Sequence, residues 1–223
     1  MVNEKLKGMA ALFPGVKLGM LAQFPVITVK LTGTRPAGDP AEIDKAADWC
    51  TEQLGDKVFS RAGRSMEAEI AFLLKNAGST IGVAESCTGG LVSHLLTNVA
   101  GSSDYFLFSG VTYANSAKKK VLAVSEETLE QYGAVSEETA REMAAGVRRI
   151  SGADYGLATS GIAGPEGGTD AKPVGTLCVG ISARDRTIAK TFHSPFKERL
   201  SNKQIFAICA LDMLRRFIAK DEQ

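Results

Sequence analysis

Thr80-Ile81-Gly82-Val83-Ala84-Glu85-Ser86-Cys87-Thr88-Gly89-Gly90 is the stretch that decides the fold of this chain. Residues 80–84 are apolar and predict a buried strand, and the apolar spacing of residues 91–96 predicts a helix. We expect the first backbone N–H groups of that helix to be unpaired and partly positive at the loop. The two glycines let a ligand approach the backbone. Ser86 and Cys87 then offer two nucleophiles beside a place for an anion or an oxyanion.

The composition is that of an ordinary soluble globular protein. Of 223 residues, 44% are hydrophobic and 23% are charged, and the net charge is +1. This balance gives no bulk basic field for nucleic acid or a membrane surface. No run of about 18 apolar residues is present to span a bilayer. The first residues have no long apolar core of the kind that directs secretion, so we expect a cytoplasmic protein.

Cysteines and acidic residues give no sign of a metal or another cofactor. The cysteines stand at 50, 87, 178 and 209 and form no Cys-x-x-Cys pair, which argues against a zinc knuckle and a disulfide framework. The acidic residues show no ligand spacing, and no Gly-Lys-Ser/Thr follows either glycine-rich loop as a P-loop requires. We therefore expect neither a metal nor a cofactor.

The chain predicts two units joined by a linker at residues 61–63. Residues 1–62 predict a small α+β unit, with helices at 2–12 and 41–54, strands at 26–32 and 57–59, and a loop at 34–40. Residues 64–223 alternate strands with helices, which is typical of an α/β layered domain with ligand loops at the strand ends. We expect a three-layer α/β/α domain with a mixed sheet.

Local signals place the elements of the second unit. Strands are predicted at 80–84, 106–113, 155–160, 177–182 and 187–192, the last two as a hairpin. Ser65, Ser125 and Ser136 are predicted helix N-caps, and Asn115 is a further one. The closing helix is predicted over about 198–219, with Leu200 among the apolar residues of its inward face.

Two glycine-rich loops are the candidate site. The first is residues 86–90, and the second, residues 161–176, spends five glycines and two prolines over 161–175. Because both loops follow strands, both can lie at the same edge of one sheet. Loops of the second kind are usually functional or disordered, and the alternative is that both are merely tight turns.

Ser86 needs a base to become a nucleophile, and Lys118 is the best candidate. His94 lies inside a predicted helix, His193 ends a strand, and no Gly-x-Ser-x-Gly elbow is present. Lys118 sits one turn into the helix after the strand that ends at residue 113, so it can point into the same crevice. Lowering its pKa from about 10.4 to about 7 costs roughly 4–5 kcal/mol. The alternative is that residues 118–120, all lysines, form a solvated face.

Five motifs occur together in this chain: Ala84-Glu85-Ser86-Cys87-Thr88-Gly89-Gly90, Thr112-Tyr113-Ala114-Asn115-Ser116-Ala117-Lys118, Gly133-Ala134-Val135-Ser136, Ser160-Gly161-Ile162-Ala163-Gly164-Pro165 and Lys172-Pro173-Val174-Gly175-Thr176. In this order and at these separations they resemble the C-terminal domain of the CinA (competence/damage-inducible) family. The resemblance covers about residue 64 to the end. Residues 1–62 resemble, more weakly, the KH-like middle region of full-length CinA, truncated and without the larger molybdopterin-binding-like domain upstream.

The resemblance implies an amidohydrolase that converts nicotinamide mononucleotide to nicotinic acid mononucleotide and ammonia in pyridine nucleotide recycling. It implies Ser86 and Lys118 as the catalytic pair, with Tyr113 assisting in positioning or proton transfer. The substrate-binding residues that it implies are Thr88, Gly89, Gly90, Asn115, Ser160, Gly161, Ala163, Gly164, Gly167, Gly168 and Arg199. Of these groups, the helix N-terminus, the backbone of 164–168 and Arg199 are suited to a phosphate.

Several alternatives stay open in the sequence. Cys87 is the rival nucleophile because thiolates are more nucleophilic at neutral pH, although we expect it to be a buried packing residue. The family usually shows Gly-Asp-Arg before the last helix and another Arg four residues on, where this chain has Lys197-Glu198-Arg199 and Lys203. A catalytically weak nucleotide-binding or regulatory protein is therefore the second hypothesis. A nucleic-acid adaptor is disfavoured because residues 1–62 lack a Gly-x-x-Gly loop. A closed homodimer is the default assembly.

Overall fold

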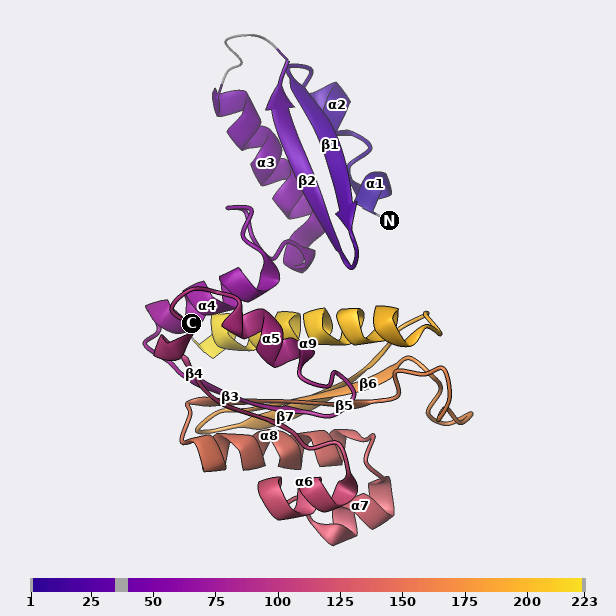
Figure 1. Ribbon diagram of the computed structural model, residues 1–223. Helices are drawn as coiled ribbons and strands as arrows, with labels where there is room; N and C mark the ends of the chain where they lie inside the picture. Colours follow the sequence, from indigo (N-terminus) through magenta and orange to yellow (C-terminus); the bar gives the residue numbers. More distant parts are fainter. Residues whose placement is uncertain (1, 35–39, 222–223) are drawn as a thin grey trace. The chain divides into compact units, whose positions relative to one another are not determined.

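The structure is a computed structural model that describes residues 2–34 and 40–221, the side chains of residues 220 and 221 excepted. The chain divides into two compact units, Met1–Gly63 and Arg64–Gln223 (Figure 1). Each unit has a hydrophobic core of its own. The loop predicted at 34–40 falls mostly on residues 35–39, which lie outside the described residues.

The first unit is a two-stranded antiparallel sheet with helices packed on it. Its elements are α1 (Val2–Lys5), α2 (Met9–Leu12), β1 (Val16–Gln23), β2 (Val26–Gly33), α3 (Pro40–Leu54) and the 3-10 helix η1 (Gly55–Lys57). Its core joins buried Leu6 and Met9 to the buried residues of α3 and to Val16. The prediction of a small α+β unit is confirmed.

Two details predicted for this unit are wrong, and one strand was not predicted. The helix expected at 2–12 is two short helices separated by a turn. The strand β1 was not predicted, because Gly19 and Leu21 interrupt its apolar alternation, and in the structure only Val16 of its eight residues is buried. Residues 57–59 form no strand, since Lys57 is the last residue of the 3-10 helix that begins at the positive-φ residue Gly55.

The second unit is built on a five-stranded mixed sheet in the order β4-β3-β5-β6-β7. The strands are β3 (Ile81–Glu85), β4 (Phe106–Val111), β5 (Tyr155–Gly161), β6 (Thr176–Ser182) and β7 (Thr187–His193). β3 is parallel to both β4 and β5, whereas β5, β6 and β7 are antiparallel to one another in turn. The loops after β3 and β5 therefore leave the same edge of the sheet, side by side, as predicted.

Helices cover both faces of this sheet (Figure 1). On one face lie α4 (Met66–Asn76), α5 (Leu91–Thr97) and α9 (Arg199–Asp221), with the short 3-10 helix η2 (Ser102–Asp104) between α5 and β4. On the other lie α6 (Asn115–Leu122), α7 (Glu126–Tyr132) and α8 (Glu137–Ser151). The three-layer α/β/α architecture with a mixed sheet is confirmed.

Glycines in the sheet let α8 approach it closely. A Cβ at Gly156 of β5 would collide with the backbone oxygen of Ala144, and one at Gly180 of β6 with that of Ala140. Val147, Met143 and Ala144 of α8 are fully buried against the sheet in the same core. Because α8 packs this closely on the sheet, the loop that precedes it, residues 133–136, is held near the edge of the sheet.

The predicted caps are right in three of four cases. Ser65, Ser125 and Ser136 accept hydrogen bonds from the backbone N–H three residues on, as N-caps do. Asn115 is wrong as a cap, because the N-cap of α6 is Ala114 and no side chain closes that end. Leu200 is also wrong as an inward residue. It lies in the first turn of α9 with 76% of its surface exposed, and the buried face of α9 begins at Asn202.

Candidate active site

A cavity of about 200 Å³ opens where the loops after β3, β4 and β5 meet the first turn of α9. Seven of the residues singled out in the sequence line it: Ser86, Tyr113, Lys118, Ser160, Gly161, Ala163 and Arg199. Cys87, Ala134 and Val135 complete the lining. Ala134 and Val135 lie in the motif at 133–136, to which the sequence assigned no role in binding.

Lys118 and Ser86 lie within hydrogen-bond distance of each other. Lys118 Nζ is 3.1 Å from Ser86 Oγ, and it donates to the backbone carbonyls of Thr112 and Tyr113, each at 2.9 Å. Lys118 is 1% exposed, because it shares the inward side of α6 with buried Leu122. Its neighbour Lys119 instead pairs with Glu126 on the surface. The solvated-face reading is therefore wrong for Lys118.

Burial penalises the charged form of the Lys118 amine. Burial lowers the pKa of Lys118 below its ordinary value. A neutral amine has two protons and one lone pair. When its two protons go to the carbonyls of Thr112 and Tyr113, the lone pair is left for the hydroxyl of Ser86. This is the arrangement that a general base needs beside a nucleophile.

Cys87 faces the same cavity but is a poor nucleophile at neutral pH. Burial raises the pKa of the Cys87 thiol to about 12. The thiol therefore stays protonated, and the intrinsic advantage of a thiolate is not available. A Cβ on Gly161 would lie 3.1 Å from Cys87 Sγ, so this sulfur packs closely against the second loop. Both observations favour a packing role for Cys87.

The N-terminus of α5 is not free, which corrects the expectation from the sequence. The Glu85 carboxylate accepts from the backbone N–H groups of Gly90, Val92 and Ser93 at 2.8–3.1 Å. The partial positive charge of this helix end is thus already matched by a buried anion. Any oxyanion or phosphate must find other donors.

Several predicted binding residues lie outside the cavity lining. The hydroxyl of Thr88 is fully buried and pairs with that of Thr159 at 2.7 Å, so it serves the fold. The others beyond the lining are Gly89, Gly90, Asn115, Gly164, Gly167 and Gly168. Ser160 does line the cavity, but its Oγ donates to the Ala134 carbonyl at 2.5 Å. That bond ties β5 to the loop before α8.

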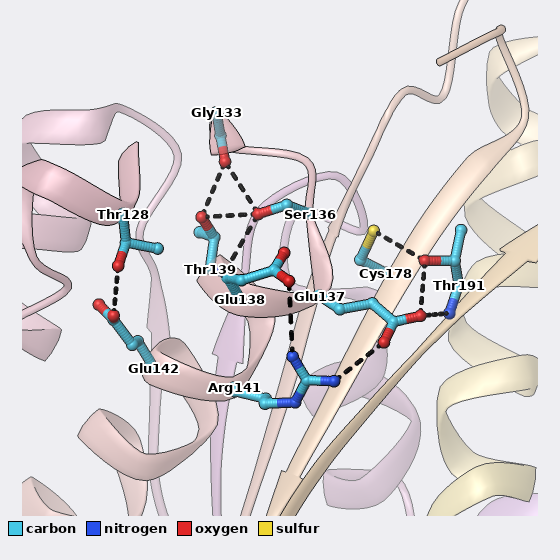
Figure 2. A network of polar contacts seen from close by, with 10 residues as sticks. All are labelled: Thr128, Gly133, Ser136, Glu137, Glu138, Thr139, Arg141, Glu142, Cys178 and Thr191. Atoms are coloured by element: carbon cyan, nitrogen blue, oxygen red, sulfur yellow. Dashed lines mark hydrogen bonds and ion pairs between the residues drawn. The ribbon is translucent and has the colours of Figure 1, made fainter. Parts of the chain in front are cut away.

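The loop at 133–136 is held from several sides. Figure 2 shows the hydroxyls of Ser136 and Thr139 donating to the Gly133 carbonyl, at 3.1 and 2.8 Å. Lys172, in the second glycine-rich loop, donates to the Tyr132 carbonyl at 2.7 Å. Glu137 at the start of α8 accepts from Thr191 of β7. These contacts fix the wall that Ala134 and Val135 present to the cavity.

Two cations lie near the start of α9: Arg199 lines the cavity, and Lys203 lies outside its lining. Arg199 donates to the Gly164 carbonyl at 3.0 Å and to the Tyr113 hydroxyl at 2.9 Å. Lys203, one turn further along α9, places its Nζ 3.3 Å from where a Cβ on Gly89 would stand. Within the described part of the chain, no carboxylate forms an ion pair with either cation. Both are therefore available to an anionic ligand.

Residues 2–34 and 40–221 hold no group of three or more His, Cys, Asp or Glu side chains placed to bind a metal ion. Over those same ranges, no helix has the length and apolar character needed to cross a membrane.

Comparison with known proteins identifies the family. A family model described as the CinA C-terminal domain matches residues 63–218. A CinA-like protein of Desulfosudis oleivorans is 52% identical over 217 residues, which are 96% of this chain and 52% of that protein. A second, from Desulforapulum autotrophicum, is 50% identical over 217 residues, 96% of this chain and 51% of that protein. The chain thus spans about half the length of these curated relatives.

Two solved structures are similar in fold to about two thirds of this chain. The competence/damage inducible protein CihA from Agrobacterium tumefaciens has a TM-score of 0.65 and 38% identity over 67% of this chain and 91% of that one. The competence damage-inducible protein A (ComA) from Klebsiella pneumoniae has a TM-score of 0.67 and 35% identity over 69% of this chain and 95% of that one. These similarities show that the chain belongs to the CinA family, through a C-terminal domain that covers residues 63–218.

Proposed function

We propose that this chain hydrolyses the carboxamide of nicotinamide mononucleotide, giving nicotinic acid mononucleotide and ammonia. The observation that carries the proposal is the buried Lys118 amine. It donates to two backbone carbonyls and lies 3.1 Å from Ser86 Oγ. A serine and a neutral lysine at this distance suit acyl transfer from an amide. Family membership and the similar motifs support the choice of this substrate.

The first half of the reaction forms an acyl-enzyme. Ser86 Oγ attacks the carboxamide carbon as its proton passes to the lone pair of Lys118 Nζ. The backbone N–H of Cys87, the residue after the nucleophile, is the donor that we assign to the oxyanion, since no backbone carbonyl among the described residues accepts from it. Lys118 then gives its proton to the amide nitrogen, the C–N bond breaks, and ammonia leaves.

The second half releases the acid. A water molecule attacks the ester carbon, and Lys118, neutral again, takes its proton. Lys118 returns that proton to Ser86 Oγ as the ester bond breaks, which restores the starting pair. Tyr113 accepts a hydrogen bond from Arg199 at 2.9 Å, which leaves its own proton to donate to the substrate. The cycle therefore uses one water and no other reactant.

The size and charge of the site suit the reacting end of a mononucleotide. The cavity of about 200 Å³ is below the roughly 300 Å³ at which pockets for drug-sized ligands begin. It therefore takes the ring and its carboxamide against the wall that Ala134 and Val135 form, and leaves the phosphate at the rim. Arg199 and Lys203 supply positive charge there, in place of the occupied N-terminus of α5.

Ammonia release tests the proposal. The purified chain is incubated with nicotinamide mononucleotide, and ammonia and nicotinic acid mononucleotide are measured together. We expect equal amounts of both products, their loss in Ser86→Ala, and their retention in Cys87→Ala. Nucleotide binding without ammonia release would instead establish the second hypothesis, a binding or regulatory protein. Turnover that depends on Cys87 and not on Ser86 would overturn the assignment of the nucleophile.

Assembly, location and the role of the first unit are further parts of the proposal. We propose a closed homodimer in the cytoplasm, because a closed dimer is the commonest assembly of soluble homo-oligomers. Residues 1–62 are proposed to be the KH-like region that precedes the deamidase domain at 64–223. Sedimentation of the purified chain tests the dimer, and a single species of monomer mass would exclude it.

A further inference from the structure

Glu85 is a fully buried carboxylate that the steps above do not use. It is the last residue of β3, directly before Ser86, and it is 0% exposed. Its Oε2 accepts from the N–H of Gly90 at 2.9 Å and of Val92 at 3.1 Å. Its Oε1 accepts from the N–H of Ser93 at 2.8 Å and from Ser93 Oγ at 2.5 Å. Four donors thus converge on one carboxylate.

These bonds close the loop that carries the nucleophile. Residues 86–89 leave the backbone of Glu85 and return, at Gly90, to its side chain. Within the loop, Ser86 N–H donates to the Thr159 carbonyl at 3.0 Å and Gly89 N–H donates to the Ser86 carbonyl at 3.1 Å. Glu85 therefore holds both ends of the segment 86–89, whose first residue is Ser86.

Glu85 also reaches the strand that leads to the base. Its backbone carbonyl accepts from Thr112 N–H at 2.8 Å, and the carbonyl of Thr112 in turn accepts from Lys118 Nζ. On the side-chain route, Ser93 Oγ lies 2.5 Å from Ser109 Oγ of β4. One residue thus connects the loop of the nucleophile to the segment that holds the amine.

We propose that Glu85 is a positioning residue that fixes Ser86 Oγ against Lys118 Nζ, and this inference rests on the proposed Ser86–Lys118 pair. Only a carboxylate fits the position. A glutamine side chain of the same size has a single acceptor oxygen, and its NH₂ group would face two of the N–H or O–H donors. Glu85→Gln therefore loosens one half of the closure without leaving a cavity.

The test compares Glu85→Gln with a matched control on the full chain. Glu142 is also a carboxylate at a helix N-terminus, because it accepts from Ser125 N–H at 2.6 Å and from Thr128 Oγ1 at 2.5 Å. It does not line the cavity. Glu142→Gln therefore reproduces the change of charge and the loss of acceptors away from the reacting groups.

Two readouts separate positioning from general stability. The first is the rate at which a fluorophosphonate labels Ser86, measured by mass spectrometry, and it requires no substrate. The second is kcat and KM for nicotinamide mononucleotide across pH. We expect Glu85→Gln to slow labelling and kcat by about 10- to 100-fold, with KM changed by less than about threefold. The rise of kcat with pH should keep its midpoint, because Lys118 is untouched.

Two results would overturn the positioning role of Glu85. Labelling at the wild-type rate in Glu85→Gln, while the amides of Gly90, Val92 and Ser93 exchange hydrogen faster, would overturn the proposal. An equal loss in Glu142→Gln would overturn it as well. If Glu85→Gln does not fold, Ser93→Ala removes one of the four donors and should slow labelling by a smaller factor.

Labelling and ammonia release by the wild-type chain separate the proposed substrate from the role of Glu85. A wild-type chain that is labelled at Ser86 but releases no ammonia refutes the substrate alone, and the labelling rates then still decide the role of Glu85. A wild-type chain that is not labelled at all refutes a reactive Ser86, and the positioning role falls with it.

Discussion

Replacing Lys118 with methionine tests the catalytic pair most directly. Methionine keeps an unbranched side chain in the buried position but removes the amine, so Ser86 loses its base and two backbone carbonyls lose a donor. Loss of a general base costs about 100- to 10,000-fold in rate, or roughly 2.7–5.4 kcal/mol of transition-state stabilisation. We expect the rate of ammonia release from nicotinamide mononucleotide to fall by about 100-fold or more.

The same substitution changes how stability depends on pH. Burial lowers the pKa of Lys118 in the folded chain, whereas the unfolded chain returns to about 10.4. Between these values the unfolded chain holds a proton that the folded chain has released, so the free energy of unfolding rises with pH. One such group contributes about 1.4 kcal/mol per pH unit across that window. The gain is complete above the unfolded value and is lost as the pH falls through the lowered one.

Urea denaturation at several pH values measures this slope, with Lys120→Met as the control. Lys120 is exposed two residues along the same helix, and its loss should change neither the slope nor the rate. Lys118→Met should flatten the rise of unfolding free energy with pH relative to both the wild type and the control. A Lys118→Met chain with the wild-type slope would show that this amine is not held neutral by the fold. Wild-type turnover in that variant would refute its role as base.

Three further predictions follow from the same geometry. The kcat/KM should rise with pH through the lowered pKa of Lys118, because only the neutral amine is a base. Cys87→Ala should leave that rise in place, because burial raises the pKa of the thiol to about 12 and keeps it protonated at lower pH. Arg199→Gln should raise KM for nicotinamide mononucleotide by about tenfold or more, because charge-assisted hydrogen bonds contribute roughly 1.5–3 kcal/mol. The rise should be much smaller for the riboside, which lacks the phosphate. Equal changes in KM for both substrates would place the phosphate elsewhere. Gly161→Ala should destabilise the chain by about 1–3 kcal/mol in denaturation, because its Cβ would lie 2.5 Å from the Thr176 carbonyl oxygen; an unchanged midpoint would contradict this packing.

Local patterns were sufficient wherever one segment decides the outcome. The strand, loop and helix around Ser86 follow from an apolar run, small residues and helical spacing, and these signals are local even though β3 itself pairs with the distant strands β4 and β5. The serine caps at 65, 125 and 136 bind amides three residues away, so they too are readable locally. β1 was missed although its apolar residues recur at 16, 18, 20 and 22, because Gly19 and Leu21 interrupt that alternation.

The amino-acid sequence by itself determined the alternation of strands and helices, the two adjacent glycine-rich loops and the pairing of Ser86 with Lys118 as candidates. Only the tertiary structure decided that Lys118 is buried rather than solvated, that Glu85 occupies the end of α5, and that Ala134 and Val135 form a wall of the cavity. The physical reason is that burial and hydrogen-bond partners are set by segments distant along the chain. Thr112, Ser86 and the loop before α8 come together only when β3, β4 and β5 pair side by side.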